Sequence, residues 1–218
     1  MKDLIIISGL HSKDNNDNGP YDWKTCYESF KTSYLDIIGD RDIYLVTYSS
    51  PFVDELLDTY KPKGYLIYNI SEFDKRNQIS NFADIMNIVE DKEQYNRVLM
   101  TRFDILYKKK LNEWNVNNSK INLSFNTPMR FLPGDTVRAI NDVLILFNIE
   151  YYDYILKKLN AHYDRHHHKL DGMHHIFHFK KEWVNYMFKG KYFSDTDKPE
   201  VIKLNDNPMY ILFRKKRF

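Results

Sequence analysis

Residues 98–107, VLMTRFDILY, decide the fold of this chain: they form an apolar run that is interrupted by Arg102 and Asp104. We expect one buried strand here, with the cation and the carboxylate two residues apart and so on one side of the pleat. A buried charge is costly without a partner, which leaves two interpretations of the pair. It is an internal ion pair at a strand end, or it is a site for a metal-bound diphosphate with the guanidinium as phosphate clamp.

Strand-like and helix-like segments alternate before this run, a pattern that predicts a mostly parallel central sheet flanked by helices. After it the pattern loosens, so we expect one α/β domain over residues 1–218 with a more irregular C-terminal part. The expected strands are 4–8, 42–48, 64–69, 98–107, 121–125, 141–148, 201–204 and 209–213, and the expected helices are 22–38, 51–60, 78–89 and 149–159.

Composition excludes several classes of protein. The formal charge of +2 gives no reason to expect a nucleic-acid partner. The lone cysteine, Cys26, excludes an internal disulfide and cysteine-rich zinc sites, and it fits a reducing compartment. No stretch reads as a secretory signal or approaches the roughly 20 apolar residues of a membrane helix. We therefore expect a soluble, cytoplasmic protein.

The loop after the first expected strand, SGLHSKDN at residues 8–15, has one glycine and no Gly-Lys-Ser. It resembles neither a P-loop nor the dinucleotide-binding fingerprint. Kinases, P-loop ATPases and ordinary dehydrogenases are disfavoured.

Seven of the eight histidines lie between His162 and His178. Imidazole is a common ligand of divalent ions, and a histidine-rich tract favours metal binding. If the segment is helical, His174 and His178 are four residues apart and face one ion, although the zinc-protease pattern is absent. The alternative is that the tract packs an irregular region.

Two further polar residues have open interpretations. Asp142 precedes the apolar segment 143–147, either as a turn or capping residue or as a base or hydrogen-bond acceptor for the substrate. Arg76 belongs to a polar helix face with Gln78 and Asn81, which is either solvated or in contact with a ligand.

The order of these segments resembles the GT-A-fold glycosyltransferases, most closely the small ones encoded by large DNA viruses and by some bacteria. The resemblance rests on a strand ending in SG, the helical segment DWKTCYESFKTSYLDII, the strand DIYLVTY and the segment LMTRFDILY. It covers roughly residues 3–148, and the R-F-D-I segment is its most specific part.

The resemblance implies a nucleotide-diphosphate sugar as donor and a divalent ion, Mn²⁺ or Mg²⁺, on its diphosphate. The family's DxD motif stands here as R-x-D, so Asp104 would be the metal ligand from this motif, with His174 or His175 completing the site. Arg102 would act on the diphosphate, and Asp142 would be the catalytic carboxylate at the acceptor. The predicted nucleotide contacts are Ser8, Gly9, Leu10, His11, Thr47, Tyr48, Arg76 and Arg102.

We therefore expect a metal-assisted glycosyltransferase, with residues 1–107 as the nucleotide-binding half and residues 108–218 as the acceptor and metal-completing half. Its acceptor would be the hydroxyl of a glycan or glycoprotein, and its location the cytoplasm, that of the host if the protein is viral. Two other functions stay open. One is a noncatalytic nucleotide- or sugar-binding module on the same fold, and the other is a metal-dependent nucleotidyltransferase or hydrolase.

Overall fold

The computed structural model describes residues 2–9, 23–125, 136–138, 144–163, 178–188 and 210–212. Its strands are β1 (Lys2–Ser8), β2 (Arg41–Tyr48), β3 (Gly64–Tyr68), β4 (Tyr95–Arg102), β5 (Ile105–Tyr107), β6 (Ile121–Phe125), β7 (Thr136–Arg138), β8 (Ile145–Asn148), β9 (His178–Lys180), β10 (Val184–Phe188) and β11 (Tyr210–Leu212). Its α-helices are α1 (Trp23–Phe30), which continues as a π-helical turn over Lys31–Leu35, α2 (Val53–Tyr60), α3 (Gln78–Asn87) and α4 (Tyr152–Tyr163).

A seven-stranded sheet in the order β10-β6-β8-β4-β1-β2-β3 forms the centre of the fold. Strands β4, β1, β2 and β3 are parallel neighbours, whereas β8 runs antiparallel to both β4 and β6. The parallel strands therefore all end at one edge of the sheet. Two small antiparallel pairs, β11-β5 and β7-β9, complete the described strands.

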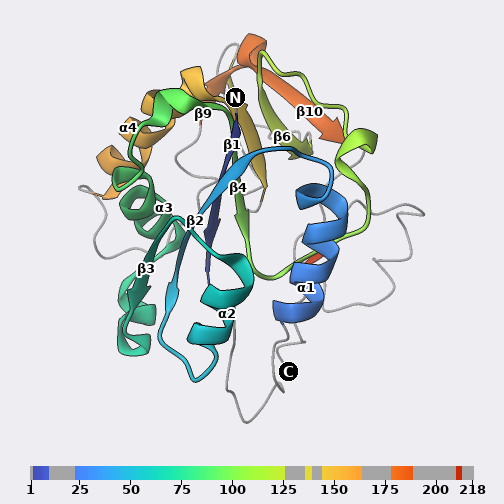
Figure 1. Ribbon diagram of the computed structural model, residues 1–218. Helices are drawn as coiled ribbons and strands as arrows, with labels where there is room; N and C mark the ends of the chain where they lie inside the picture. The colour runs from blue at the N-terminus through green and yellow to red at the C-terminus, as the bar shows by residue number, and fades with distance from the viewer. Residues whose placement is uncertain are drawn as a thin grey trace, which may run out of the picture.

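Helices cover both faces of the sheet (Figure 1). The buried side chains divide accordingly into two clusters, one with α1 and α2 and the other with α3 and α4. Within β1, Leu4 and Ile6 belong to the α3 cluster while Ile5 and Ile7 belong to the α1 cluster, as the alternation of a strand requires. Both faces of this strand are apolar because both are buried.

Local sequence accounts for how several elements begin and pack. The Asn77 side chain accepts from the backbone N–H of Ser80 at 2.9 Å, and the Ser80 hydroxyl oxygen accepts from the backbone N–H of Asn77 at 3.1 Å. These two hydrogen bonds form a capping box at the start of α3. At the start of β3, a Cβ on Gly64 would lie 2.5 Å from Cε1 of Tyr44. Only glycine lets that ring lie across the strand.

The prediction of one strand over residues 98–107 is wrong. Strand β4 ends at Arg102, a turn follows at Phe103 and Asp104, and β5 pairs with β11 outside the main sheet. The apolar pattern continues past the turn because β5 is buried as well, in the cluster of side chains that contains α1 and α2. There Tyr107 packs on Phe30 of α1, with 5.3 Å between ring centroids.

The other predicted strands and helices agree with the described part of the chain to within a few residues. The helix considered for residues 173–180 does not extend to their end, because His178–Lys180 form strand β9. Of the segment 141–148, only residues 144–148 are described, and β8 occupies four of them. The predicted strand 201–204 lies outside the described residues, while 209–213 contains β11.

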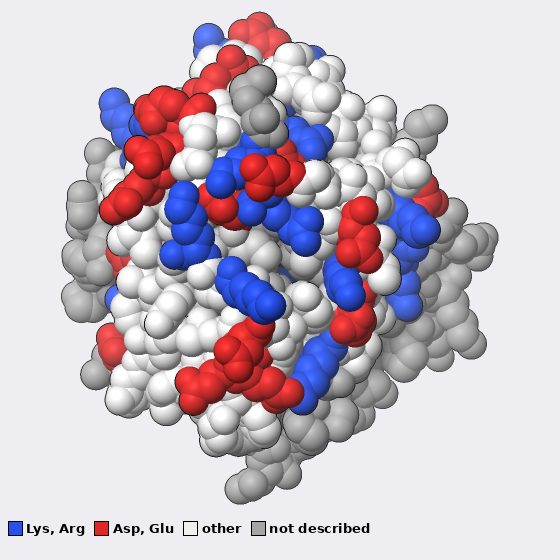
Figure 2. All heavy atoms as spheres, viewed as in Figure 1, with Lys and Arg blue, Asp and Glu red and all other residues white. Residues whose placement is uncertain are grey.

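Charged side chains of both signs are intermixed over the face that carries α1 and α2 (Figure 2). This agrees with the nearly balanced composition. None of the helices in the described part of the chain is long and apolar enough to cross a membrane.

Candidate functional site

The carboxyl ends of the parallel strands bring several predicted site residues to one edge of the sheet. Ser8 of β1 is the register partner of Arg102 of β4 and of Val46 of β2. Thr47 and Tyr48 directly follow Val46 at the end of β2. By strand alternation Ser8, Arg102 and Tyr48 project toward α3, and Thr47 projects toward the other face. Open α/β sheets bind ligands at this edge.

Arg102 and Asp104 form a two-pronged ion pair across the turn after β4. Nε of Arg102 donates to Oδ1 of Asp104 at 2.8 Å, and Nη2 donates to Oδ2 at 2.5 Å. The side chains are only 18% and 14% exposed. Phe103, between them, is buried on the α1 side against Tyr60, which holds the turn in place. The ion pair that the sequence suggested is thus present, at the end of the strand and not within it.

The hydroxyl of Ser8 is buried beside this pair without a hydrogen-bond partner. The residue is 0% exposed, and its Oγ is the only such unsatisfied side-chain atom among the described residues. A buried hydroxyl without a partner is destabilising by about 1–3 kcal/mol. Such a group at a ligand-binding edge is a candidate ligand contact.

Gly9 makes the turn that follows β1. Its φ of +128° is in the region that favours glycine. Its N–H donates to the carbonyl of Val46 at 3.2 Å, and its own carbonyl accepts from the Thr47 hydroxyl at 2.8 Å. Gly9 and Thr47 therefore fix the loop between β1 and the site, and Thr47 contributes through the backbone of Gly9.

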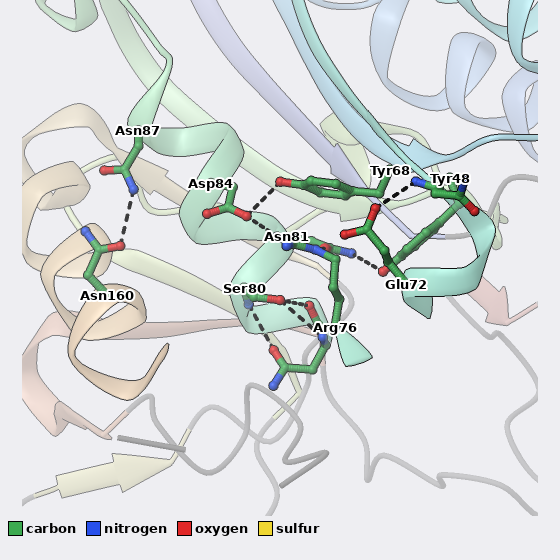
Figure 3. A network of polar contacts seen from close by, with 11 residues as sticks. Tyr48, Tyr68, Glu72, Arg76, Ser80, Asn81, Asp84, Asn87 and Asn160 are labelled. Carbon is green, nitrogen blue, oxygen red and sulfur yellow. Dashed lines mark hydrogen bonds and ion pairs between the residues drawn. The ribbon is translucent and has the colours of Figure 1, made fainter. Parts of the chain in front are cut away.

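A polar network extends from Tyr48 into α3 (Figure 3). Asn81 donates to the Tyr48 hydroxyl at 3.0 Å and accepts from Nε of Arg76 at 3.2 Å. Arg76 also pairs with Asp84, which accepts from the Tyr68 hydroxyl at 2.7 Å. Burial raises the pKa of Tyr48, against the opposing effects of Asn81 and Arg76, so its hydroxyl stays protonated near neutral pH.

This network changes the interpretation of Arg76. Its guanidinium lies 3.6 Å from the Tyr68 ring centroid, between Asn81 and Asp84, in a side chain that is 14% exposed. Arg76 precedes α3, and Asn81 is buried at 3% exposure, so of the two interpretations the solvated helix face does not hold for these two residues. Arg76 thus holds Asn81, which in turn donates to Tyr48, and the predicted contact of Arg76 with the nucleotide stays a prediction.

Sequence reasoning missed the inward role of Asn81, Asp84 and Tyr68. The capping pattern Asn77-x-x-Ser80 marks where α3 begins, and the helical period then sets which residues share each face. That period places Asn81 and Asp84 within one turn of each other and next to Ile85 of the buried stripe. It could have indicated that both polar side chains face the sheet.

Five predicted site residues lie outside the described residues: Leu10, His11, Asp142, His174 and His175. Their roles stay predictions. Among the residues with a described structure, no group of three or more His, Cys, Asp or Glu side chains could hold a metal ion. Asp104 is the described carboxylate of the predicted metal site, and both its oxygens already accept from Arg102. The described donor set does not by itself form a divalent-ion site.

No family model matches the sequence, and no curated protein matches it. Several solved structures resemble the fold. The glycosyltransferase GlyE of Streptococcus pneumoniae TIGR4 is 15% identical with a TM-score of 0.41, over 79% of this chain and 41% of GlyE, so the chain spans about two fifths of its length. The galactosyltransferase LgtC, solved with donor and acceptor sugar analogues, is 10% identical with a TM-score of 0.46, over 84% and 72%.

The CTP:phosphocholine cytidylyltransferase LicC of Streptococcus pneumoniae is 12% identical with a TM-score of 0.50, and the match covers 94% of this chain and 97% of LicC. At these identities the likeness concerns the fold alone. The predicted fold class is confirmed: the chain is a single α/β domain with a mostly parallel, mixed seven-stranded sheet flanked by helices.

Proposed function

We propose that this protein is a glycosyltransferase that moves a sugar from a nucleotide-diphosphate sugar to an acceptor hydroxyl of a glycan or glycoprotein. One observation carries the proposal: the largely buried Arg102–Asp104 pair stands at the carboxyl end of the central strand β4, beside the unsatisfied hydroxyl of Ser8. A fixed guanidinium and a buried hydroxyl at this edge suit the phosphates of a nucleotide.

The reaction sets the roles of these residues. The bond from the sugar's anomeric carbon to the diphosphate breaks while a bond to the acceptor oxygen forms, and the acceptor proton goes to a base. Negative charge grows on the leaving diphosphate, where the Arg102 guanidinium can stabilise it. Ser8 would hydrogen-bond the same ligand, and Tyr48, held by Asn81, would border the nucleoside. Asp142 as the base stays a prediction.

Metal assistance is a further part of the proposal. A divalent ion, when bound, would add positive charge to the leaving diphosphate. Asp104 would have to share its carboxylate between the ion and Arg102, and His174 or His175 would supply the remaining protein ligand. Mn²⁺ and Mg²⁺ are the candidate ions.

A ligand screen tests the proposal first. Ligands that bind the native state raise its thermal stability in proportion to occupancy. We expect nucleoside diphosphates and nucleotide sugars to raise the Tm, and Arg102→Gln to remove the shift. A screen in which no nucleotide or nucleotide sugar shifts the Tm, with or without Mn²⁺, would contradict the proposal.

Two other functions would be revealed by the products. A noncatalytic module would bind a nucleotide sugar without turnover. A nucleotidyltransferase, the activity named for LicC, which this chain matches over nearly its whole length, would release pyrophosphate from a nucleoside triphosphate. A glycosyltransferase releases a nucleoside diphosphate from a nucleotide sugar.

The division into a nucleotide-binding half, residues 1–107, and an acceptor half, residues 108–218, belongs to the same proposal. The described site residues belong to the first half, while Asp142, His174 and His175 of the second half lie outside the described residues, so the division stays a prediction. A viral source and a cytoplasmic location stay predictions.

A further inference from the structure

Strand β4 carries two arginine–aspartate pairs with nearly the same geometry, one at each end. At the amino end, Arg97 donates from Nε to Oδ1 of Asp3 at 3.1 Å and from Nη2 to Oδ2 at 2.6 Å. At the carboxyl end, Arg102 makes the corresponding bonds to Asp104 at 2.8 and 2.5 Å. The side chains are similarly shielded, at 25% and 8% exposure for the first pair and 18% and 14% for the second.

The two pairs differ in what they connect. Arg97 and Asp3 are 94 residues apart, so their ion pair joins β4 to β1. Arg102 and Asp104 are two residues apart, so theirs closes the turn at the end of β4, in which Phe103 is buried. The first pair explains itself as a link between strands. The second places two charges, largely shielded from solvent, at the edge where open α/β sheets bind ligands.

The second pair also determines the charge that a ligand meets. Where a DxD motif would offer two carboxylates, this turn offers one carboxylate and a guanidinium that does not lose its proton. Both oxygens of Asp104 accept from that guanidinium. A divalent ion bound to Asp104 would therefore lie close to the positive charge of Arg102. Asp104 occupies the Nε and Nη2 side of the guanidinium and fixes its orientation, so an anion would contact the other edge of the same planar group.

We infer that Arg102, oriented by Asp104, binds the donor diphosphate directly and without a metal ion. This inference rests on the proposed function and concerns the same site. In this binding step Asp104 acts by holding Arg102 in position. Any part that Asp104 has in turnover is separate from this role. Metal ions can increase turnover, but they are not needed for the diphosphate to bind.

Calorimetry of the full chain with inorganic pyrophosphate, UDP and CDP tests this, in EDTA and again with Mn²⁺. We expect binding in EDTA with affinity within about tenfold of that with Mn²⁺, because the resident guanidinium supplies the charge. Binding that requires Mn²⁺ would overturn the inference while leaving the proposed function standing. Absence of binding under both conditions would overturn the inference and count against the proposed function as well.

Variants separate the roles of the two residues. Arg102→Gln should remove binding in EDTA, and Arg102→Lys should weaken it about tenfold, because lysine keeps the charge but lacks the planar fork. Asp104→Asn should weaken binding in EDTA by less than Arg102→Gln does, because the guanidinium remains and only its orientation is loosened. The matched control is Arg97→Gln, which should lower stability and leave the affinity unchanged. Loss of EDTA binding in Asp104→Asn, with Arg102→Gln unaffected, would overturn the inference.

Discussion

Ser8 of β1 and Arg102 of β4 are register partners at the ends of adjacent parallel strands. The buried hydroxyl of Ser8 lacks a partner among the described residues, while Arg102 is fixed by Asp104. Both side chains project toward the face that carries α3, so one ligand could contact both. The free protein therefore leaves a polar group unsatisfied at the edge where this fold binds ligands.

Ser8→Ala should leave the free energy of unfolding of the free protein unchanged or raise it by about 1 kcal/mol, because it removes an unsatisfied buried hydroxyl. The same change should reduce the Tm shift produced by a nucleoside diphosphate. Urea unfolding and thermal shift measure the two effects.

Ser124→Ala is the matched control for Ser8→Ala. Ser124 is as fully buried, but its hydroxyl donates to the carbonyl of Leu144 at 3.1 Å. Its loss should lower the free energy of unfolding by about 1 kcal/mol and leave the ligand-induced shift unchanged. Equal destabilisation by the two variants would show that Ser8 is structural.

Arg97→Gln should destabilise the fold by about 2–3 kcal/mol, because it leaves the carboxylate of Asp3 shielded from water without its cation. Arg102→Gln should cost about 1–2 kcal/mol, because the carboxylate of Asp104 that it leaves without its cation is somewhat more exposed than that of Asp3, at 14% against 8%. Urea unfolding at pH 7 compares the variants. A larger loss of unfolding free energy in Arg102→Gln than in Arg97→Gln would show that the Arg102–Asp104 pair mainly stabilises the fold.

Asp42 should make stability depend on pH in the acid range. Burial opposes its ionisation, but hydrogen bonds from Tyr95, Lys2 and Lys63 lower its pKa below the ordinary 3.8. A carboxyl group with a lowered pKa stabilises the fold above its unfolded pKa, and this stabilisation disappears as the pH falls through the folded pKa. Asp42→Asn should therefore cost about 1–3 kcal/mol at pH 7.

The cost of Asp42→Asn should shrink below about pH 4, where the wild-type carboxyl group itself becomes protonated. Urea unfolding at pH 7 and pH 3 measures the difference. A destabilisation that is the same at both values would contradict the role assigned to the hydrogen bonds with Tyr95 at 2.5 Å and Lys63 at 3.0 Å.

Gly64→Ala should destabilise the fold by about 1–3 kcal/mol, since its Cβ would lie 2.5 Å from the ring of Tyr44. Gly39→Ala is the control, because no atom lies within 4 Å of its added Cβ. Thermal unfolding compares the two variants. Equal Tm values would show that the Tyr44 ring does not pack across β3 as described.

Much of the fold could be predicted from local patterns. The apolar run at Leu4–Ile7 and the spacing of Trp23, Cys26 and Phe30 gave a strand and a helix close to β1 and α1. These signals are strong because both sheet faces are buried and each helix packs through one stripe.

Other features depend on tertiary contacts that no local pattern carries. The run at residues 98–107 stays apolar across the turn, because Phe103 and Ile105 are buried in a layer different from that of Met100. Likewise, nothing in the sequence shows that Asp3 pairs with Arg97, or that Ser8 lacks a partner. Most predicted site residues of the first half were placed from strand ends, and the sequence suggested the Arg102–Asp104 pair but not the contacts of Tyr48 and Thr47.

Turnover of nucleotide-diphosphate sugars tests the central claim most directly. Purified protein is incubated with a panel of these sugars and Mn²⁺, and release of nucleoside diphosphate is measured by chromatography. We predict slow hydrolysis of at least one nucleotide sugar, which Arg102→Gln and Asp104→Ala abolish while Arg97→Gln retains it in the folded fraction. Absence of release across the panel, or full activity in Asp104→Ala, would contradict the account.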